Sequence, residues 1–249
     1  MYDRKDGTVI IVLFGGIIES IKELLYPRRC VVCDRPPGYG RMICPGCIGK
    51  LRVVRGPVCC KCGKPLRDES EELCKDCKRA KHFFTKGRSV YEYKSIRKSV
   101  YRFKYSGRSE YADYYGKAMA HYLGDTIREW DPDVIIPVPI HKKRLAKRGY
   151  NQSALLASGL ARELGIPFTE NLVKRTKNTI PMKELDAHQR QINLKNAFIV
   201  APNDVKLDTI VVVDDIYTTG STIDAVAAVL KDAGARDVYF VCLSSGASM

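Results

Sequence analysis

The stretch from Ile210 to Thr222 reads Ile-Val-Val-Val-Asp-Asp-Ile-Tyr-Thr-Thr-Gly-Ser-Thr. Four apolar, β-prone residues run into two adjacent carboxylates and then into a hydroxyl-rich turn with one glycine. Apolar residues then recur at helical spacing until Gly234, which suits a helix C-terminus. The pattern predicts a strand, a loop and a helix whose N-terminus faces the loop. Such a loop presents free backbone N–H groups to an anion, usually a phosphate.

The residues of this loop narrow the choice of ligand. No lysine follows the glycine, so the loop is not the P-loop of nucleotide-binding proteins. Asp214 and Asp215 would repel a bare phosphate, whereas ribose 5-phosphate also offers ring hydroxyls and an anomeric carbon that can become cationic. The alternative is a surface turn with solvated aspartates. The candidate phosphate-binding residues are Thr218, Thr219, Gly220, Ser221 and Thr222.

This block resembles the phosphoribosyl-pyrophosphate (PRPP) motif of type I phosphoribosyltransferases, and the match is contiguous through the loop. The resemblance implies that the 5-phosphate binds at Thr218–Thr222. It also implies that Asp214 and Asp215 are the catalytic pair, which would hydrogen-bond the ribose hydroxyls and stabilise positive charge at the anomeric carbon.

Eight of the ten cysteines form four Cys-x-x-Cys pairs that repeat after 29 or 30 residues. The repeat predicts two closed, tetrahedral, structural zinc sites of four thiolates each. Iron–sulfur ligation and a redox-active pair are the alternatives, and ligation across the two halves stays open. Cys60 is a spare thiol, and Cys242 is expected in the core. The candidate ligands are Cys30, Cys33, Cys44, Cys47, Cys59, Cys62, Cys74 and Cys77.

Positive charge is concentrated in one part of the chain. Residues 27–110 carry 22 basic and 8 acidic residues, while residues 111–249 carry 17 and 16. Such a surface favours a polyanionic partner, nucleic acid before an anionic membrane, although it could serve solubility alone. Aromatic residues that could stack bases lie among the basic ones, so single-stranded DNA is the expected partner of this region. These aromatic residues are Tyr91, Tyr93, Tyr101, Phe103 and Tyr105.

The N-terminal residues 1–26 are expected to form an amphipathic helix that docks on the protein. Their apolar run from Val9 to Ile18 contains two glycines and is too short to span a membrane. It also lacks a small-residue cleavage site, so we expect neither a signal peptide nor a membrane span and predict a cytoplasmic protein.

The rest of the chain alternates between strand and helix patterns, which predicts an α/β fold with a parallel sheet flanked by helices. The expected domains are the N-terminal region 1–26, a double zinc ribbon at 27–82 and a phosphoribosyltransferase-like domain at 83–249. The expected strands are 87–93, 133–140, 166–173, 197–200, 210–213 and 238–243, and the expected helices are 95–104, 111–130, 151–164 and 223–233. In the first helix, Ile96, Val100 and Phe103 are expected on one face, and Arg97, Lys98, Arg102 and Lys104 on the other, solvent-facing side. Tyr122 is expected to point inward from the second helix, and Asn151 is expected to cap the third.

A basic loop, residues 141–148, follows the strand 133–140. Ligands bind at the carboxyl ends of parallel strands, so this loop and the hydroxyl-rich loop are expected to converge. Arg144, Lys147 and Arg148 would then bind a diphosphate. Residues 174–196 are expected to form a lid that adds Arg190 to this set, together with Lys174, Arg175 and Asn193.

Nearly the whole chain resembles the ComF competence family, in its ribbons and in the segments Phe103–Arg108, Pro137–His141, Arg144–Gln152, Gln189–Arg190, Asn193 and Asp214–Gly220. The resemblance implies a PRPP site with Mg²⁺ on the diphosphate and a role in DNA uptake, with DNA-uptake or helicase proteins as further partners. The acceptor stays open. The alternatives are a salvage or amidophosphoribosyl-type transferase with purely structural ribbons, and a PRPP sensor without turnover.

Overall fold

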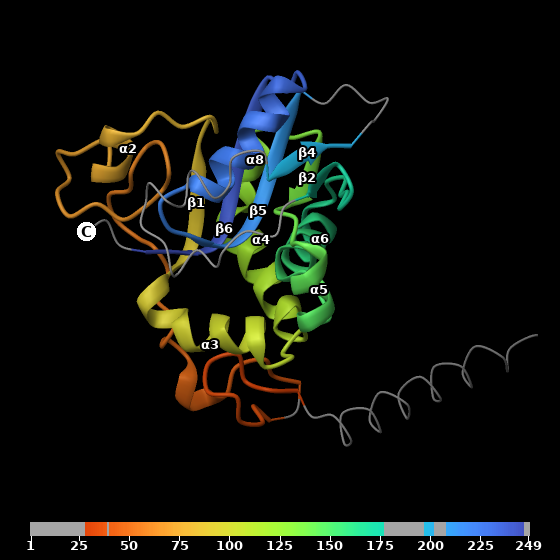
Figure 1. Ribbon diagram of the computed structural model, residues 1–249. Coiled ribbons are helices and arrows are strands. Elements are labelled where there is room, and N and C mark those ends of the chain that lie inside the picture. Colours follow the sequence, from red (N-terminus) through yellow and green to blue (C-terminus); the bar gives the residue numbers. More distant parts are fainter. Residues whose placement is uncertain (1–27, 39, 177–196, 202–207, 247–249) are drawn as a thin grey trace, which may run out of the picture. The chain divides into compact units, whose positions relative to one another are not determined.

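The computed structural model describes residues 28–38, 40–176, 197–201 and 208–246 (Figure 1). It divides into two compact units, residues 1–48 and 49–249. The boundary falls between the two ribbons, so the second ribbon shares a unit with the sheet. The sequence motifs instead suggest boundaries at 26/27 and 82/83, which remain a prediction about modules. The predicted N-terminal helix lies outside the described residues.

The described part of the first unit is a small, turn-rich ribbon. A turn holds Cys30 and Cys33, where the N–H of Asp34 donates to the carbonyl of Cys30 at 2.8 Å. The short 3₁₀ helix η1 (Pro45–Cys47) carries the last cysteine of this ribbon.

The second unit contains a four-stranded parallel sheet in the order β1-β6-β5-β2 (Figure 1). The strands are β1 (Gly87–Glu92), β6 (Asp237–Ser245), β5 (Thr209–Tyr217) and β2 (Val134–Pro137). The predicted parallel sheet is confirmed. However, β5 does not end at Val213, because Asp214, Ile216 and Tyr217 pair with Cys242, Ser244 and Ser245 of β6. The two aspartates therefore lie within the strand and not in the loop.

Three helices pack together against the sheet: α3 (Tyr93–Tyr105), α4 (Tyr111–Glu129) and α6 (Gln152–Leu164). As predicted, Asn151 caps α6, and its side-chain oxygen accepts from the N–H of Ser153 at 3.2 Å. Helices α4 and α6 approach closely at Gly116 and Gly159, where a Cβ on Gly116 would lie 3.0 Å from the Cα of Gly159. Tyr122, predicted to point inward from α4, is 43% exposed.

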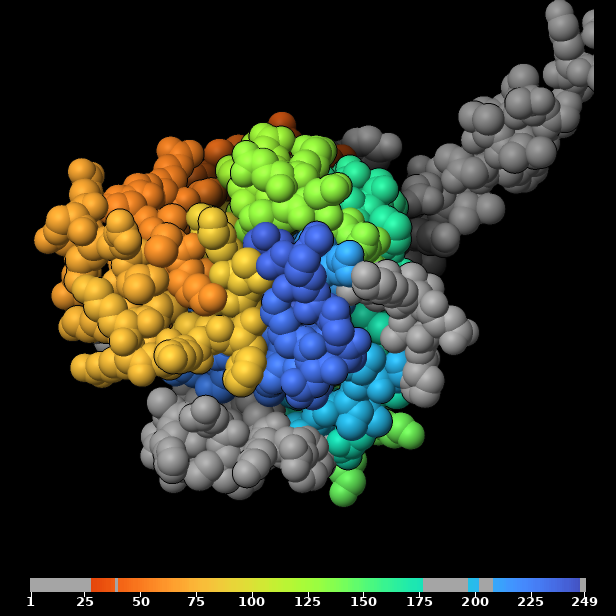
Figure 2. Space-filling view, turned by 90° about the horizontal axis from the view of Figure 1, so that it is seen from above, coloured from red at the N-terminus to blue at the C-terminus, as the bar shows by residue number. Residues whose placement is uncertain are grey.

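Another set of elements forms the largest described hydrophobic cluster on the sheet. This cluster joins β2, β5 and β6 to α8 (Ser221–Asp232) and to the second ribbon, which includes α2 (Lys75–Arg79). In Figure 2 the orange and yellow atoms of the second ribbon and its linker lie beside the blue atoms of the C-terminal elements. Three cysteines of the second ribbon, Cys59, Cys62 and Cys74, belong to this cluster and are fully buried.

Two predicted segments differ from the structure. The expected strand 166–173 forms a single bridge, between Phe168 and Ile135, and a separate hairpin pairs β3 (Val173–Arg175) with β4 (Phe198–Val200). The expected basic loop 141–148 forms the helix α5 (Lys142–Arg148). The ring nitrogen Nδ1 of His141 caps this helix and accepts from the N–H of Lys143 at 3.2 Å, which satisfies one free donor of its first turn.

None of the helices that the structure describes combines the length and the apolar character needed to cross a bilayer.

Candidate functional site

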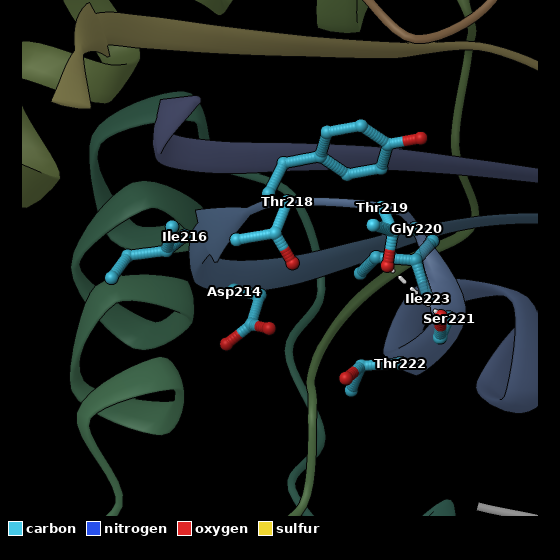
Figure 3. Close-up of a pocket in the computed structure, with 9 residues that line it drawn as sticks. Asp214, Ile216, Thr218, Thr219, Gly220, Ser221, Thr222 and Ile223 are labelled. Carbon is cyan, nitrogen blue, oxygen red and sulfur yellow. Dashed lines mark hydrogen bonds between the residues drawn. The ribbon is translucent and has the colours of Figure 1, made fainter. Parts of the chain in front are cut away.

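A pocket lies where β5 ends and α8 begins (Figure 3). The carboxylate of Asp214 and the hydroxyls of Thr218 and Thr222 lie around one open space, and Ile216 points away from it. The hydroxyls of Thr219 and Ser221 are 3.0 Å apart and share a hydrogen bond. The predicted hydroxyl-rich loop therefore forms one side of a pocket at the N-terminus of α8. The pocket is lined by Asp214, Ile216, Tyr217, Thr218, Thr219, Gly220, Ser221, Thr222 and Ile223.

Gly220 cannot be replaced in this loop without strain. Its φ is +87°, a left-handed conformation that side chains disfavour, and it is the N-cap of α8. A Cβ at this position would lie 2.7 Å from the hydroxyl of Tyr217 and 3.3 Å from Cε1 of His82. The glycine lets the backbone turn tightly over Tyr217, which leaves the N–H groups of the first helical turn available to an anion.

The two aspartates have different surroundings. Asp214 lines the pocket, and its Oδ1 accepts from the Ser153 hydroxyl and from the N–H of Asp215, both at 2.8 Å. Burial, and then the charge of Asp215, raises the pKa of Asp214 to about 7. Asp215 is only 3% exposed, and its Oδ2 is buried without a hydrogen-bond partner among the described residues. Such an oxygen calls for a donor that the described part of the protein does not supply.

Lys104 enters this site from α3. Its ammonium nitrogen lies 2.8 Å from Oδ1 of Asp215, and its side chain is only 19% exposed. Burial acts to lower the pKa of Lys104, but the charges of Asp215 and Asp214 outweigh it and raise the pKa. The sequence pattern had placed Lys104 on the solvent face of the helix with Arg97 and Lys98, and this expectation was wrong.

Arg144, Arg148 and Arg175 form a chain of neighbouring cations, and Arg175 lies within electrostatic reach of Asp214. Burial, and then the charge of Arg148, lowers the pKa of Arg144. Burial, and then the charge of Arg144, lowers the pKa of Arg175 to about 10, against the opposing influence of Asp214. The guanidinium group of Arg144 therefore lies within electrostatic reach of both Arg148 and Arg175. Lys147 of the same helix is exposed, and Arg190 lies outside the described residues.

Lys104 is a site residue that the candidate set omits. The motif Phe103–Arg108 marked the neighbourhood of Lys104, but helical periodicity alone turned its side chain outward. Arg175 was expected in a lid over the diphosphate, but it lies in strand β3. Its side chain lies over the ring of Phe198, with the guanidinium carbon 5.3 Å from the ring centre, so the β3–β4 hairpin holds it in place.

The cysteines form two separate groups, each drawn from one half of the repeat: Cys30, Cys33, Cys44 and Cys47 in the first unit, and Cys59, Cys62, Cys74 and Cys77 in the second. Within each group all four sulfurs lie within 4.8 Å of one another. Pairing within each half is thus settled, and Cys60 belongs to neither group.

Both groups suit zinc. The sulfurs of Cys33 and Cys44 are 3.7 Å apart and those of Cys62 and Cys74 are 3.6 Å apart. A tetrahedral Zn²⁺ with bonds of about 2.3 Å separates its sulfurs by about 3.8 Å. The N–H of Cys44 also donates to the sulfur of Cys30 at 3.4 Å. Burial opposes ionisation of Cys30, but backbone N–H groups such as that of Cys33 outweigh it and lower the pKa to about 7.

The second cysteine group adjoins the hydroxyl-rich loop. Burial, and then the negative thiolates of Cys62 and Cys77, raises the pKa of Tyr217 far above its usual value. Lys64 lies 5.5 Å from the centre of the Tyr217 ring, and its buried ammonium group forms an ion pair at 2.6 Å with the partly exposed Asp76. Tyr217 therefore separates the second metal site from Gly220.

The linker after the second ribbon also contacts α8 directly. Nδ1 of His82 lies 2.6 Å from Oδ2 of Asp224, and the N–H of Phe83 donates to the other carboxylate oxygen at 3.0 Å. His82 also stacks on Phe84, with ring centres 4.6 Å apart. The first turn of α8 is thus fixed from the ribbon side as well as from the sheet.

Known protein families match both the ribbon region and the sheet region of this chain. The family described as "Double zinc ribbon domain" matches residues 21–78, and the "Phosphoribosyl transferase domain" family matches residues 110–248. "Competence protein F" of Haemophilus influenzae is 31% identical over 221 residues, which cover 84% of this chain and 93% of that protein.

Two further relatives span most of the chain. "DNA utilization protein YhgH" of Escherichia coli strain K12 is 32% identical over 226 residues, 88% of this chain and 98% of the relative. "Competence protein ComFC" of Bacillus subtilis strain 168 is 30% identical over 203 residues, 77% of this chain and 79% of the relative. The paired ribbons, the parallel sheet and these matches together show that the chain belongs to the ComF family of proteins with a phosphoribosyl transferase domain.

Proposed function

We propose that this protein binds PRPP at the end of β5 and acts in DNA uptake during natural transformation, in the cytoplasm. The observation that carries the PRPP site is the pocket in which the carboxylate of Asp214 meets the hydroxyls of Thr218 and Thr222 at the N-terminus of α8. This combination suits a ligand with both a phosphate and hydroxyl groups. The 5-phosphate would bind to Thr218–Thr222, and the ribose hydroxyls would donate to Asp214 and Asp215.

The diphosphate of PRPP needs positive charge. Arg144 and Arg148 of α5 and Arg175 of β3 supply fixed cations, and Lys147 and Arg190 remain proposed members of this set. Mg²⁺ would neutralise further charge on the diphosphate when PRPP is bound. If the protein is catalytic, it transfers the phosphoribosyl group to a nitrogen nucleophile and releases diphosphate. Asp214 and Asp215 would stabilise the cationic anomeric carbon as the bond to diphosphate breaks.

The role in DNA uptake is supported by the names of the relatives, two of which are called competence proteins and one a DNA utilization protein. The proposed partner is single-stranded DNA, bound through the basic region of residues 28–108. Charge supports this assignment, since residues 27–110 carry 22 basic and 8 acidic residues.

Ligand-induced stabilisation tests the PRPP site. PRPP with Mg²⁺ should raise the melting temperature of the full chain, because a ligand that binds only the folded state stabilises it by mass action. Thr219→Val removes one hydroxyl from the loop and should reduce the shift. Thr169→Val, which changes a threonine outside the pocket, is the matched control. No shift with PRPP and Mg²⁺ would refute the proposed site.

A second measurement separates a transferase from a PRPP sensor. Diphosphate release is followed over a panel of bases and amines, with the parent protein and with Asp214→Asn. Turnover with one acceptor that is lost in Asp214→Asn supports a transferase, including the salvage or amidophosphoribosyl-type alternative. PRPP binding without release over the whole panel supports a sensor.

A further inference from the structure

The exposed face of α3 carries a continuous stripe of basic and aromatic side chains. Lys94, Arg97, Lys98, Tyr101 and Tyr105 are all exposed and recur at the three- and four-residue spacing of one helical face. The opposite face packs inward through Ile96, Val100 and Phe103. At 1.5 Å per residue the stripe is about 16 Å long. We call these five residues the α3 stripe.

The two tyrosines of the stripe form a surface on which flat rings could stack. Tyr101 is 61% exposed and Tyr105 is 59% exposed, although both are large. Their ring centres are 5.1 Å apart. By contrast, Tyr91 and Phe103, which the sequence pattern grouped with them as stacking candidates, are fully buried and cannot contact a ligand.

A second basic helix meets the end of the stripe. The guanidinium carbon of Arg148, in α5, lies 5.2 Å from the centre of the Tyr105 ring. Tyr150, just after α5, donates a hydrogen bond to the carbonyl of Phe103, and their rings are 5.9 Å apart. The stripe therefore continues onto α5 next to the arginines of the proposed PRPP site.

The charge of both helices has one sign. Helix α3 has five basic residues and no acidic one, and the same is true of α5. Among the described residues, Lys94, Arg97 and Lys98 take part in no ion pair, so their charge is not neutralised within that part of the protein. Solvated helices on protein surfaces usually carry both positive and negative side chains. Because α3 and α5 carry only positive ones, this face is suited to a polyanion.

We propose that the α3 stripe is where single-stranded nucleic acid binds, with the phosphates on Lys94, Arg97 and Lys98 and two bases stacked on Tyr101 and Tyr105. This proposal rests on the proposed function and narrows the contact from residues 28–108 as a whole to one helix of the sheet unit. A strand on this stripe would lead towards Arg148, so its bases would pass the proposed PRPP site. Rigid aromatic rings among unpaired cations are the usual components of sites that bind single strands without sequence preference.

Binding of a fluorescent, mixed-sequence single-stranded oligonucleotide to the full chain tests the proposal. Tyr101→Ala and Tyr105→Ala should each weaken binding about tenfold, since stacking of one base on an aromatic side chain is lost. Phe83→Ala removes another exposed aromatic ring, away from α3, and should leave binding unchanged. Tyr105→Trp should retain binding and show quenching of its fluorescence by the strand, with the parent's Trp130 as the reference signal.

The salt dependence tests the charge of the stripe. With the three cations Lys94, Arg97 and Lys98 on phosphates, the plot of log K against log salt should have a slope of about −2, since each phosphate contact contributes about −0.7. Reversal of Lys94, Arg97 and Lys98 to glutamate should shift this slope towards zero by about 2. The matched control reverses three exposed lysines elsewhere in the sheet unit, Lys81, Lys86 and Lys117, which change the net charge equally.

Each outcome decides one of the two proposals. If the parent binds single strands but the stripe variants bind like their controls, the α3 stripe is wrong and the proposed function stands. If the parent binds no strand at any salt, the nucleic-acid part of the proposed function fails with it. Preferential binding to duplex DNA or to anionic vesicles would also overturn the stripe as a single-strand site. Ribose 5-phosphate binding by each variant verifies that the fold is intact.

Discussion

The ammonium group of Lys104 and the carboxylate of Asp215 form an ion pair of 2.8 Å in which both side chains are largely buried. Lys104 reaches Asp215 from the helix of the α3 stripe, whereas Asp215 lies in β5 beside the pocket-lining Asp214. The pair therefore links the proposed nucleic-acid surface to the proposed ribose site through one side chain. It also balances part of the negative charge that two adjacent carboxylates bring into the sheet.

Removal of the Lys104 charge should destabilise the protein strongly. Lys104→Met leaves the Asp215 carboxylate buried without a counter-ion, and the loss of one member of a buried pair costs about 3 kcal/mol. Lys98→Met, on the exposed face of the same helix, should change the free energy of unfolding by less than about 0.5 kcal/mol. Urea unfolding measures both changes. Addition of Asp215→Asn to Lys104→Met should recover most of the lost stability, because it removes the buried charge. Equal effects of Lys104→Met and Lys98→Met on the free energy of unfolding would show that the pair contributes no stability.

The stability of the ligand-free protein should fall as the pH rises from about 4 to about 7. Asp214 has a folded-state pKa of about 7, raised from 3.8 by burial and by Asp215. In this range the folded protein holds a proton on Asp214 that the unfolded chain has already released, so acid favours the folded state. The stabilisation is complete below pH 4 and lost above pH 7. The urea midpoints at pH 5 and pH 8 should differ more in the parent than in Asp214→Asn, because asparagine has no carboxyl group to titrate. An equal difference between the two midpoints in both proteins would contradict the raised pKa of Asp214.

Local sequence patterns predicted the elements that depend on near neighbours. The Asn151 cap needs only the N–H of Ser153, and the core face of α3 follows from the spacing of Ile96, Val100 and Phe103. The pocket-forming loop was also predictable, because the turn over Gly220 is encoded within a few residues. These features depend on intrinsic backbone preferences and on side-chain periodicity, both of which are visible along the chain.

The predictions that failed depend on residues distant in sequence. Lys104 turns inward because Asp215, far along the chain, offers a buried negative charge. Strand β5 extends through both aspartates because β6 pairs with it as far as Ser245. The fusion of the second ribbon with the sheet depends on contacts of Cys62 with the cluster around Tyr217. Periodicity describes one segment at a time and contains no information on such pairings.

Gly220→Ala should disrupt the loop that we propose binds phosphate. The added Cβ would lie 2.7 Å from the Tyr217 hydroxyl, and the residue would have to keep a φ of +87°. We expect at least a tenfold loss of ribose 5-phosphate affinity, measured by calorimetry. Gly165→Ala is the matched control, since Gly165 also has a positive φ, +70°, but nothing lies within 4 Å of its added Cβ.

Comparison with a second variant identifies the cause of the loss in Gly220→Ala. The double variant Gly220→Ala/Tyr217→Phe lacks the clashing hydroxyl and should regain part of the affinity. If the double variant is as weak as Gly220→Ala, backbone strain alone is responsible. If Gly165→Ala weakens binding equally, the effect comes from general destabilisation and not from the loop.

Loss of metal from the second site should weaken phosphate binding, whereas loss from the first should not. Cys62→Ser opens the second site, whose thiolates lie against Tyr217, the residue beneath Gly220. Cys33→Ser opens the first site, which belongs to the other compact unit. Each variant should lose one of two zinc ions per chain by elemental analysis, and Cys60→Ser should lose none. Because the anchor of the loop is damaged only in Cys62→Ser, ribose 5-phosphate affinity should fall about tenfold in that variant alone. Equal affinities in Cys62→Ser and Cys33→Ser would show that the second ribbon does not support the loop.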